Sequence, residues 1–577
     1  MQASWVAALS LFLFFIGYRY YSRFLAEKIF QLDPSAVTPA HTYKDGVDYV
    51  PANKFVLWGH HFTSIAGAAP IVGPAIAVYW GWLPAMLWVV IGTIFAAGIH
   101  DFGTMVLSIR NKGQSIGTLA DKLVGKRAKL LFLFIILILV LMVNAVFAWV
   151  ISNLFITFPA SVLSIFVQIP LAVWIGFRAW RATGNMIVPS VLALIAMYGT
   201  AILSSYIPAM QIDLVQWFGG EESIVLFGLS GMEMAFFTWI VILMVYVYFA
   251  STLPVWMLLQ PRDLINAWQL LLGLGILYAG LFVLSPEITA PPTNPESTDV
   301  GWFPLLFITV ACGAISGFHG LVSSGTTAKQ LDKETDARFV GYLGSVGEGM
   351  LALITIVAIV TYFNTTGEFL AHYHSFANAS SGGLAIFVEG AAVLAGGVGI
   401  PLQAAQTIIA VIVISFAATT LDTSVRLMRY ILNELGETYH IRPLTRLHIS
   451  TIVAVGSSTL LVLLPEGPHG FGSGGYILWP LFGTSNQLLA GISLLLLTIW
   501  LKRNGRPIIY SLVPMVFVLA MTLWAMGSQV IFDWSGLGKH DMDLLLFTFG
   551  SIILGFTLWI VLEAVRLVRN PENSSES

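Results

Sequence analysis

The chain has 577 residues, of which 57% are hydrophobic and 10% are charged, and its formal net charge is −3. Soluble globular domains carry about 25% charged residues, so this composition excludes a protein that is surrounded by water on all sides. The small net charge gives no reason to expect nucleic acid as a partner, and the single cysteine excludes an intramolecular disulfide. Most of the surface must face lipid.

Apolar segments recur along the whole chain. A helix needs about 20 residues to cross a hydrocarbon core, and about fifteen segments reach or approach that length. They lie near residues 4–25, 54–77, 84–109, 128–152, 160–177, 186–206, 224–250, 264–284, 302–325, 339–362, 400–425, 447–464, 475–500, 508–527 and 543–566. The sequence therefore predicts an all-α polytopic membrane protein in a lipid bilayer. A shorter apolar stretch, 385–399, is interpreted as a re-entrant half-helix.

Basic residues predict how the chain is oriented. Lys and Arg mark the cytoplasmic ends of membrane spans, and the loop 110–129 carries six of them. With this loop in the cytoplasm, strict alternation of the spans places every Lys and Arg except Lys539 on the cytoplasmic side. The N-terminus is then predicted outside and the C-terminus in the cytoplasm. The oligomeric state stays open.

Two of the predicted spans resemble one another. Residues 58–74 read WGHHFTSIAGAAPIVGP and residues 311–329 read ACGAISGFHGLVSSGTTAK, so that two glycines and a histidine recur at the same spacing. The two spans are predicted to run in opposite directions. Paired, Gly/Pro-interrupted spans in an inverted repeat are typical of secondary transporters. The alternative is that the glycines only allow close helix packing and the hydroxyls bond across helices.

A helix broken inside a membrane is tolerated only in protein or beside a watery cavity. The freed amides and carbonyls can hold a carboxylate or a small cation. We therefore predict a substrate site at the two breaks, formed by His61, Thr63, Ser64, Gly67, His319, Ser323 and Ser324. Adjacent helical residues diverge by about 100°, so of His60 and His61 only one is expected to face the site, while the other bonds a neighbouring helix. Adjacent histidines also lack the spacing of metal ligands, and no metal site is predicted.

Glu348 lies ten residues into the span 339–362, between glycines that allow another helix or water to approach. Ionisable residues at this depth usually mark a transport pathway, and we predict that Glu348 carries the coupling proton. The alternative is a protonated acid bonded to a backbone carbonyl.

Three other charged motifs are interpreted as structural. His100 and Asp101 are placed near the cytoplasmic interface, with an inner gate as the alternative. Asp422 and Arg426 have the i, i+4 spacing of an ion pair on one helix, and the adjacent pair at 262–263 is interpreted in the same way.

Six motifs resemble the carbon starvation protein A family of peptide and pyruvate permeases. They are GHHFTSIAGAAPIVGPA (59–75), HDFG (100–103), LPVWMLLQPRD (253–263), SGFHGLVSSGTT (316–327), TTLDT (419–423) and LWPLFGTSNQLLAG (478–491). The resemblance implies uptake across the bacterial inner membrane during nutrient starvation. It also implies a fold like that of the amino acid–polyamine–organocation superfamily, with two inverted five-helix repeats, and it adds Asn486 to the expected site.

The expected domains follow from this resemblance. Residues 1–53 form an N-terminal helix and a cytoplasmic loop, and 54–284 hold the first repeat with two additional helices. Residues 302–500 hold the inverted second repeat, and 501–577 form two C-terminal helices and a polar tail.

The predicted function is secondary active uptake of short peptides or pyruvate by proton symport with alternating access. Sodium is the less favoured coupling ion, and no cofactor is expected. The chain lacks a GxxxxGK[ST] motif for ATP binding. A membrane-embedded haem or redox protein, or an enzyme using the intramembrane histidines, is the rival hypothesis, and a passive channel is a third.

Overall fold

A computed structural model describes the chain except residues 183–185, 295–296, 298, 468–469, 538–541 and 570–577. Lys539 and the polar tail 570–577 therefore lie outside the described residues. Across the described part the chain is helical, with isolated β-bridges and no sheet. Thirteen of its helices are long and apolar enough to cross a membrane, or fourteen if a bent pair is counted as one span. The all-α class is confirmed.

The long helices are α1 (Ala3–Ile16, continued to Phe30), α6 (Trp82–Gly92), α7 (Gly98–Ile109), α9 (Lys126–Thr157), α10 (Val162–Ala182), α11 (Ile187–Tyr206), α13 (Gly231–Thr252), α14 (Leu259–Leu284), α17 (Leu343–Val360), α19 (Phe376–Gly396), α20 (Leu402–Thr438), α21 (Leu447–Leu463), α22 (Gly474–Arg503), α23 (Ile509–Ser528) and α24 (Leu544–Arg569). A π-helical stretch, Thr93–Ala97, joins α6 and α7 into one span. The short helix α2 (Ser22–Phe24) belongs to the first span, whereas α3 (Pro39–Thr42), α8 (Ile116–Leu123), α12 (Leu214–Trp217) and α18 (Thr366–His372) occupy connections.

The predicted number of spans was fifteen, and the difference has local causes. The two segments predicted to be broken are split, into α4 (Lys54–Ile65) with α5 (Ala69–Ala77), and into α15 (Trp302–Thr309) with α16 (Gly317–Gly325). Helix α21 has only 17 residues.

The interpretation of 385–399 as a short half-helix is wrong. Helix α19 begins earlier in the chain, where the Ser375 side chain accepts a hydrogen bond from the Asn378 amide. Its 21 residues are long and apolar enough to cross a membrane. Hydropathy missed the start because the first turns, which include Asn378 and Ser380, are polar.

Helix α13 begins at Gly231 rather than near residue 224. Ser230 and Glu233 form a capping box, in which each side chain accepts a hydrogen bond from the other residue's backbone amide. Glu233 therefore stabilises the first turn of the helix and does not lie at mid-span.

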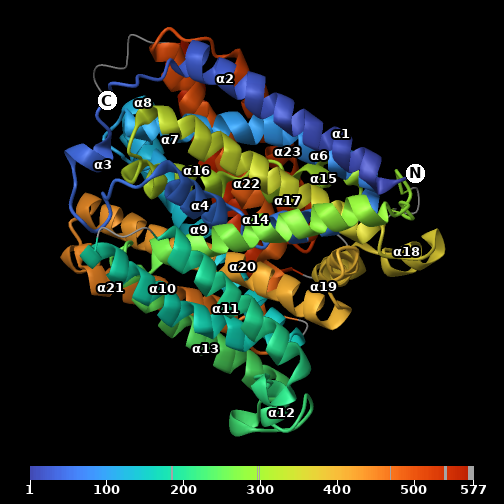
Figure 1. Cartoon of the computed structure of the whole chain (residues 1–577). Helices are drawn as coiled ribbons and strands as arrows, with labels where there is room; N and C mark the ends of the chain where they lie inside the picture. Colours follow the sequence, from blue (N-terminus) through green and yellow to red (C-terminus); the bar gives the residue numbers. More distant parts are fainter. Residues whose placement is uncertain (183–185, 295–296, 298, 468–469, 538–541, 570–577) are drawn as a thin grey trace.

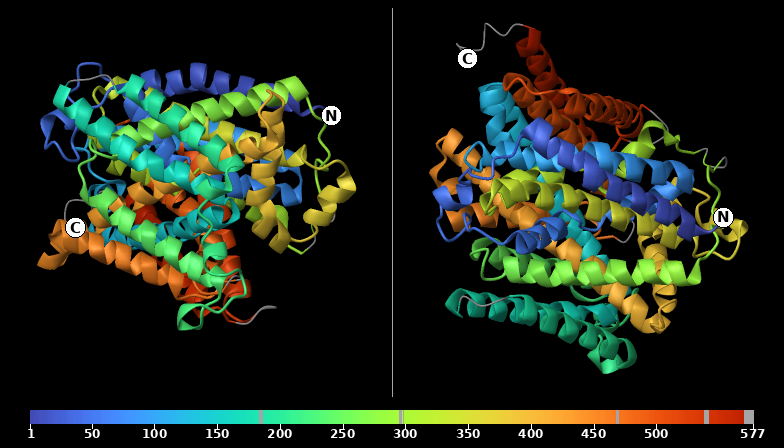
Figure 2. Two further views of the ribbon diagram at one scale, coloured as in Figure 1. Left: turned by 60° about the horizontal axis from the view of Figure 1, so that its bottom comes forward. Right: turned by 45° about the horizontal axis from the view of Figure 1, so that its top comes forward.

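The spans lie side by side, with the broken ones in the middle (Figure 1). The membrane-spanning parts of α20 and α22 are almost wholly buried, whereas most residues in those of α1, α11 and α24 are at least partly exposed. In the right-hand view of Figure 2, α10 and α11, in teal, lie at the edge of the bundle opposite α23 and α24, in red. The polar residues described below are thus enclosed by protein and separated from lipid.

The loops gather at two ends of the bundle, with α3 and α8 at one and α18 and the N-terminus at the other (Figure 1). At the first end, Arg110 forms an ion pair with Glu334, and the Arg503 guanidinium donates to the Lys122 carbonyl. We call this the basic end, because the basic segments 110–129, 329–338 and 426–446 lie there. At the other end, the Ala3 amide donates to the Pro286 carbonyl.

Candidate functional site

The first broken span bends by 46° between α4 and α5. The break includes Gly67, where a Cβ would collide with the Phe147 ring of α9 and the Thr420 hydroxyl of α20. Thr420 also donates to the carbonyl of Ser64, at a distance of 3.1 Å. The break expected from the glycines and prolines is present, and other helices pack directly against it.

The second broken span is interrupted between α15 and α16 and is held by Asn486 of α22. The Asn486 Oδ1 atom accepts a hydrogen bond from the Phe318 amide at 2.8 Å, and its Nδ2 atom donates to the Ser316 hydroxyl at 2.9 Å. An unpaired amide in a membrane costs several kcal/mol. Asn486 therefore stabilises the free start of α16.

The two breaks contact each other. A Cβ at Gly73 of α5 would collide with the carbonyl of Thr309, at the end of α15, and one at Gly313 would lie 3.1 Å from Cγ of Pro74. Segments more than 200 residues apart in the sequence are therefore in direct contact.

Three helices supply a buried chain of two carboxyl groups and an imidazole: Asp101 on α7, His319 on α16 and Glu348 on α17. The Nδ1 atom of His319 lies 2.9 Å from Asp101 Oδ2, and its Nε2 atom lies 3.0 Å from Glu348 Oε2. None of the three side chains is more than 3% exposed. We call this group the carboxylate–histidine chain.

The hydrogen bonds around Asp101 and His319 indicate how protons are shared within this chain. The Ser345 hydroxyl donates to Asp101 at 2.6 Å, and His100 Nδ1 lies 2.7 Å from the other Asp101 oxygen. Asp101 thus acts as an acceptor, and His319 Nδ1 carries a hydrogen. The contact between His319 Nε2 and Glu348 then needs one more proton, on either atom. Without that proton, two lone pairs face each other.

Glycines on α17 allow this close packing, as the sequence predicted. A Cβ at Gly347 would lie 2.6 Å from the Phe62 ring of α4, and one at Gly344 would lie 2.8 Å from the His61 ring. The glycines therefore allow another helix, α4, to pack directly beside this part of α17.

The divergence of the two adjacent histidines is confirmed. His60 Nδ1 lies 2.5 Å from Asp263 Oδ2 of α14, whereas His61 Nδ1 lies 3.0 Å from the Thr327 hydroxyl, just beyond α16. Among the described residues, the Nε2 atoms of both histidines are buried and have no hydrogen-bond partner. His61 therefore keeps a polar atom free beside the second broken span.

The remaining predicted site residues lie in the same region but differ in what they contact. The Thr63 hydroxyl donates to the Gly59 carbonyl of its own helix, and the Ser64 hydroxyl lies 3.2 Å from that of Thr423. The Ser324 hydroxyl accepts from the Ile116 amide and so anchors the start of α8. The Ser323 hydroxyl is buried and has no hydrogen-bond partner in the part of the chain that the structure describes.

Comparison with known proteins identifies the family. Residues 2–525 match the family described as Carbon starvation protein CstA. The chain belongs to the CstA family. It is 33% identical to the peptide transporter CstA of Campylobacter jejuni, over 92% of this chain and 81% of the relative. It is 31% identical to the pyruvate/proton symporter BtsT of Escherichia coli, over 92% and 82%, and 30% identical to the peptide transporter CstA of that organism, over 92% and 82%.

As a CstA-family member, this multi-pass membrane protein is a transporter and not an enzyme. The rival hypothesis of a haem or redox protein finds no support in the family, whose named relatives are transporters. Among the residues that the structure describes, no group of three or more His, Cys, Asp or Glu is arranged to hold a metal ion.

The placement of His100 and Asp101 at the interface is wrong for this CstA-family chain, because both side chains are completely buried. A signal was present in the sequence. Arg110 marks the end of the span, and Asp101 lies nine positions before it on the helix, a rise of about 13 Å. That distance places Asp101 well inside the membrane.

The two predicted ion pairs of the CstA-family chain, Asp422 with Arg426 and Arg262 with Asp263, are also wrong. Asp422 of α20 pairs with Arg262 of α14 and not with Arg426, and it accepts a hydrogen bond from Tyr246 of α13 at 2.8 Å. Arg426 instead lies 3.2 Å from Asp48. Local spacing suggested pairs within one helix, whereas tertiary packing brings partners from other helices. We call Arg262, Asp422 and Tyr246 the arginine network.

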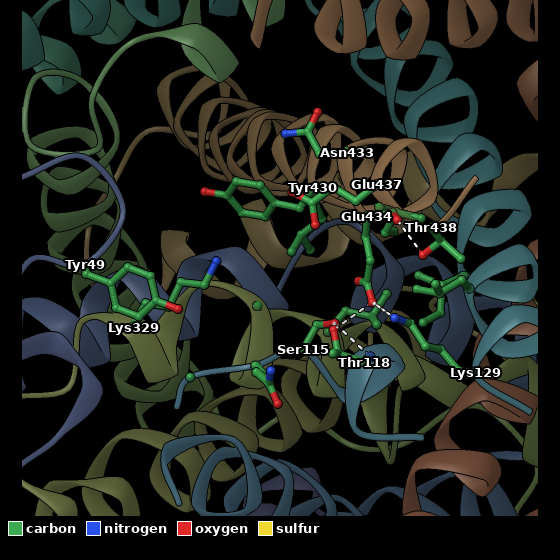
Figure 3. A pocket seen from close by; sticks show the side chains of 18 residues that line it. Tyr49, Ser115, Thr118, Lys129, Lys329, Tyr430, Asn433, Glu434, Glu437 and Thr438 are labelled. Carbon is green, nitrogen blue, oxygen red and sulfur yellow. Dashed lines mark hydrogen bonds and ion pairs between the residues drawn. The ribbon is translucent and has the colours of Figure 1, made fainter. Parts of the chain in front are cut away.

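A cavity of about 360 Å³ opens at the basic end of this CstA-family protein, between α20, α9 and the end of α16 (Figure 3). Leu321, Gly325 and Leu427 line the cavity. Leu321 lies two residues after His319 on α16, so the cavity is close to the carboxylate–histidine chain in sequence. It contains none of the predicted site residues.

Proposed function

We propose that this CstA-family protein takes up short peptides or pyruvate by proton symport. The carrying observation is that His319, on the interrupted helix α16, lies between Asp101 and Glu348. One shared proton satisfies the contact between His319 and Glu348, and its loss sets two acceptors 3.0 Å apart. Deprotonation therefore weakens the contact between α16 and α17. Such a link between protonation and helix position is what symport requires.

The substrate's carboxylate binds, in this proposal, where the two broken spans meet. The proposed substrate residues are His61, Thr63, Ser64, Gly67, His319, Ser323, Ser324 and Asn486, with Glu348 as the proton carrier. The unpartnered Nε2 atom of His61 and hydroxyl of Ser323 support this assignment, because buried polar groups without partners are costly. The names of the relatives supply the two substrate classes.

Alternating access would come from movement of the broken spans, which we propose to be corresponding elements of two inverted five-helix repeats. The chain would lie in the bacterial inner membrane with its N-terminus outside. The recurrence of the Gly-His-Gly pattern and the contact between the two breaks support the pairing of these spans.

Counterflow in proteoliposomes tests the substrate. Labelled pyruvate, dialanine and trialanine are each offered to protein-loaded vesicles, with and without sodium. Exchange of a peptide or of pyruvate is expected without sodium. Exchange of neither would contradict the proposed function, and exchange only with sodium would replace the proton as coupling ion.

The variant Glu348→Gln tests the coupling. Gln still offers hydrogen-bonding atoms but cannot take up or release a proton near neutral pH. Accumulation driven by a pH gradient is therefore expected to fall to background while counterflow continues. Glu389→Gln is the matched control, because Glu389 of α19 accepts a hydrogen bond from Tyr362 and lies outside the carboxylate–histidine chain. Normal accumulation by Glu348→Gln would remove Glu348 from the mechanism.

A further inference from the structure

The cavity at the basic end has the size of a small-molecule site. Its volume of about 360 Å³ falls within the range of about 300–1,000 Å³ common for ligand pockets. It is partly open to the exterior. A molecule leaving or approaching the broken spans along α16 would pass through this cavity.

One end of the cavity carries an unpaired cation. The Lys329 ammonium lies 4.3 Å from the centre of the Tyr430 ring and 5.4 Å from that of Tyr49. Among the described residues it makes no hydrogen bond and no ion pair, and the nearby Asp48 carboxylate contacts Arg426 and Tyr430 instead. The rings hold the ammonium in place, and its three N–H groups stay free for a ligand.

The opposite end of the cavity is acidic. Glu434 of α20 lies 3.2 Å from the Lys129 ammonium and accepts a hydrogen bond from the Thr118 hydroxyl. Glu437, three residues further along the same helix, lines the cavity and is exposed. In Figure 3, Lys329 lies beside the two tyrosines, and the two glutamates lie across the cavity from it.

We propose that this cavity is a second binding site, which holds a short zwitterionic peptide by its two ends. Lys329 binds the terminal carboxylate, and Glu437, with Glu434 beside it, binds the terminal ammonium. The proposal rests on the proposed function and names short peptides as the substrate class.

The charges of the lining favour a zwitterion over a simple anion. Two lysines and two glutamates line the cavity, so their formal charges cancel. A monocarboxylate such as pyruvate would gain one contact with Lys329 and would also face two carboxylates. A short peptide places opposite charges at its two ends and matches both walls.

Ligand protection of an engineered cysteine tests the proposal. Thr438, which lines the opening and is exposed, is replaced in Thr438→Cys, and the rate of maleimide labelling is measured in detergent-solubilised protein without a gradient. Thr445→Cys, exposed outside the cavity, is the control for ligand effects elsewhere. The wild-type protein, whose Cys312 is buried, gives the background.

Dialanine is expected to slow labelling of Thr438→Cys at lower concentrations than N-acetyl-dialanine, dialanine amide or pyruvate. Adding Lys329→Gln should raise the half-protecting concentration of dialanine at least about tenfold, because a charged hydrogen bond is lost. Adding Lys502→Gln, which changes an exposed lysine on α22, should leave it unchanged.

Glu437→Gln keeps the proposal testable if the Lys329 variant does not fold, because Glu437 is exposed. It should weaken protection by dialanine but not by N-acetyl-dialanine, which has no ammonium group. Equal protection by pyruvate and dialanine, or unchanged protection in both variants, would overturn the proposal. Counterflow without protection would refute the cavity site alone, whereas protection without counterflow of either substrate would refute the proposed function alone.

Discussion

Two buried polar networks lie on different sides of α4, and they differ in whether a proton can change their charge. The arginine network pairs the permanently charged guanidinium of Arg262 with Asp422. The carboxylate–histidine chain is built around His319, whose imidazole gains or loses a proton near neutral pH in water. On α4, His60 contacts Asp263 on one side and His61 contacts Thr327 on the other. From this difference we expect the arginine network to serve stability, whereas the carboxylate–histidine chain is the one that we propose for transport.

The largest expected effect is on folding, in the arginine network. Arg262→Gln leaves Asp422 as an uncompensated buried carboxylate, which costs about 3–5 kcal/mol. The expected result is a large loss of folded protein, measured by size-exclusion chromatography and thermal unfolding in detergent. The double variant Arg262→Gln/Asp422→Asn should recover most of the loss.

Arg23→Gln is the control for this prediction, since Arg23 pairs with Glu27 on the surface and both side chains are more than half exposed. It should leave stability unchanged. If Arg262→Gln were equally harmless, the contrast between the two networks would disappear.

The next effect is on transport, in the carboxylate–histidine chain. His319→Gln retains a polar side chain but removes the imidazole that shares a proton with Glu348, so accumulation driven by a pH gradient is expected to fall to background. Its thermal stability should fall less than that of Arg262→Gln. His448→Gln, an exposed histidine on α21, should accumulate substrate normally. Normal accumulation by the His319 variant would make this network structural as well.

A smaller effect is expected where Asn486 stabilises the start of α16. Asn486→Ala leaves the buried Phe318 amide unpaired, at a cost of about 1–3 kcal/mol. Thermal unfolding should show this loss, and counterflow should slow because α16 loses its fixed position. Asn504→Ala, which changes an exposed residue at the C-terminal end of α22, is the control. Unchanged unfolding and counterflow would mean that α16 is held by other contacts.

The smallest effect separates the two adjacent histidines. His61→Ala removes one free polar atom from the proposed site, so the half-saturating substrate concentration in counterflow should rise about two- to tenfold. His60→Gln should lower thermal stability through its contact with Asp263 and leave that concentration unchanged. The reverse pattern would place the substrate on the other side of α4.

Much of the fold could be predicted from the sequence because hydropathy follows directly from the lipid environment. The breaks near Gly67 and before Gly317 were also predictable, since glycine and proline clusters interrupt helices. Glu348 and His319 stood out as isolated polar residues within apolar spans. These signals are local, and each depends on a few neighbouring residues.

The partners of the charged residues could not be predicted in the same way. Arg426 is one turn from Asp422 in sequence, yet Asp422 is paired with Arg262, more than 150 residues away. Asp101 was placed at the interface although its distance from Arg110 indicated burial. Pairing across helices depends on how the helices pack, and no single segment contains that information.

The length of α20 links the two ends of the molecule mechanically. Its 37 residues span about 55 Å, so the helix passes beyond a 30 Å hydrocarbon core. Asp422 lies about 22 Å along this rod from Glu437. If the rod pivots at Asp422, a tilt of about 5° displaces Glu437 by about 2 Å by that geometry, enough to form or break an ionic contact. The buried pivot would thus open or close the distant mouth of the cavity without any bend in the helix between them.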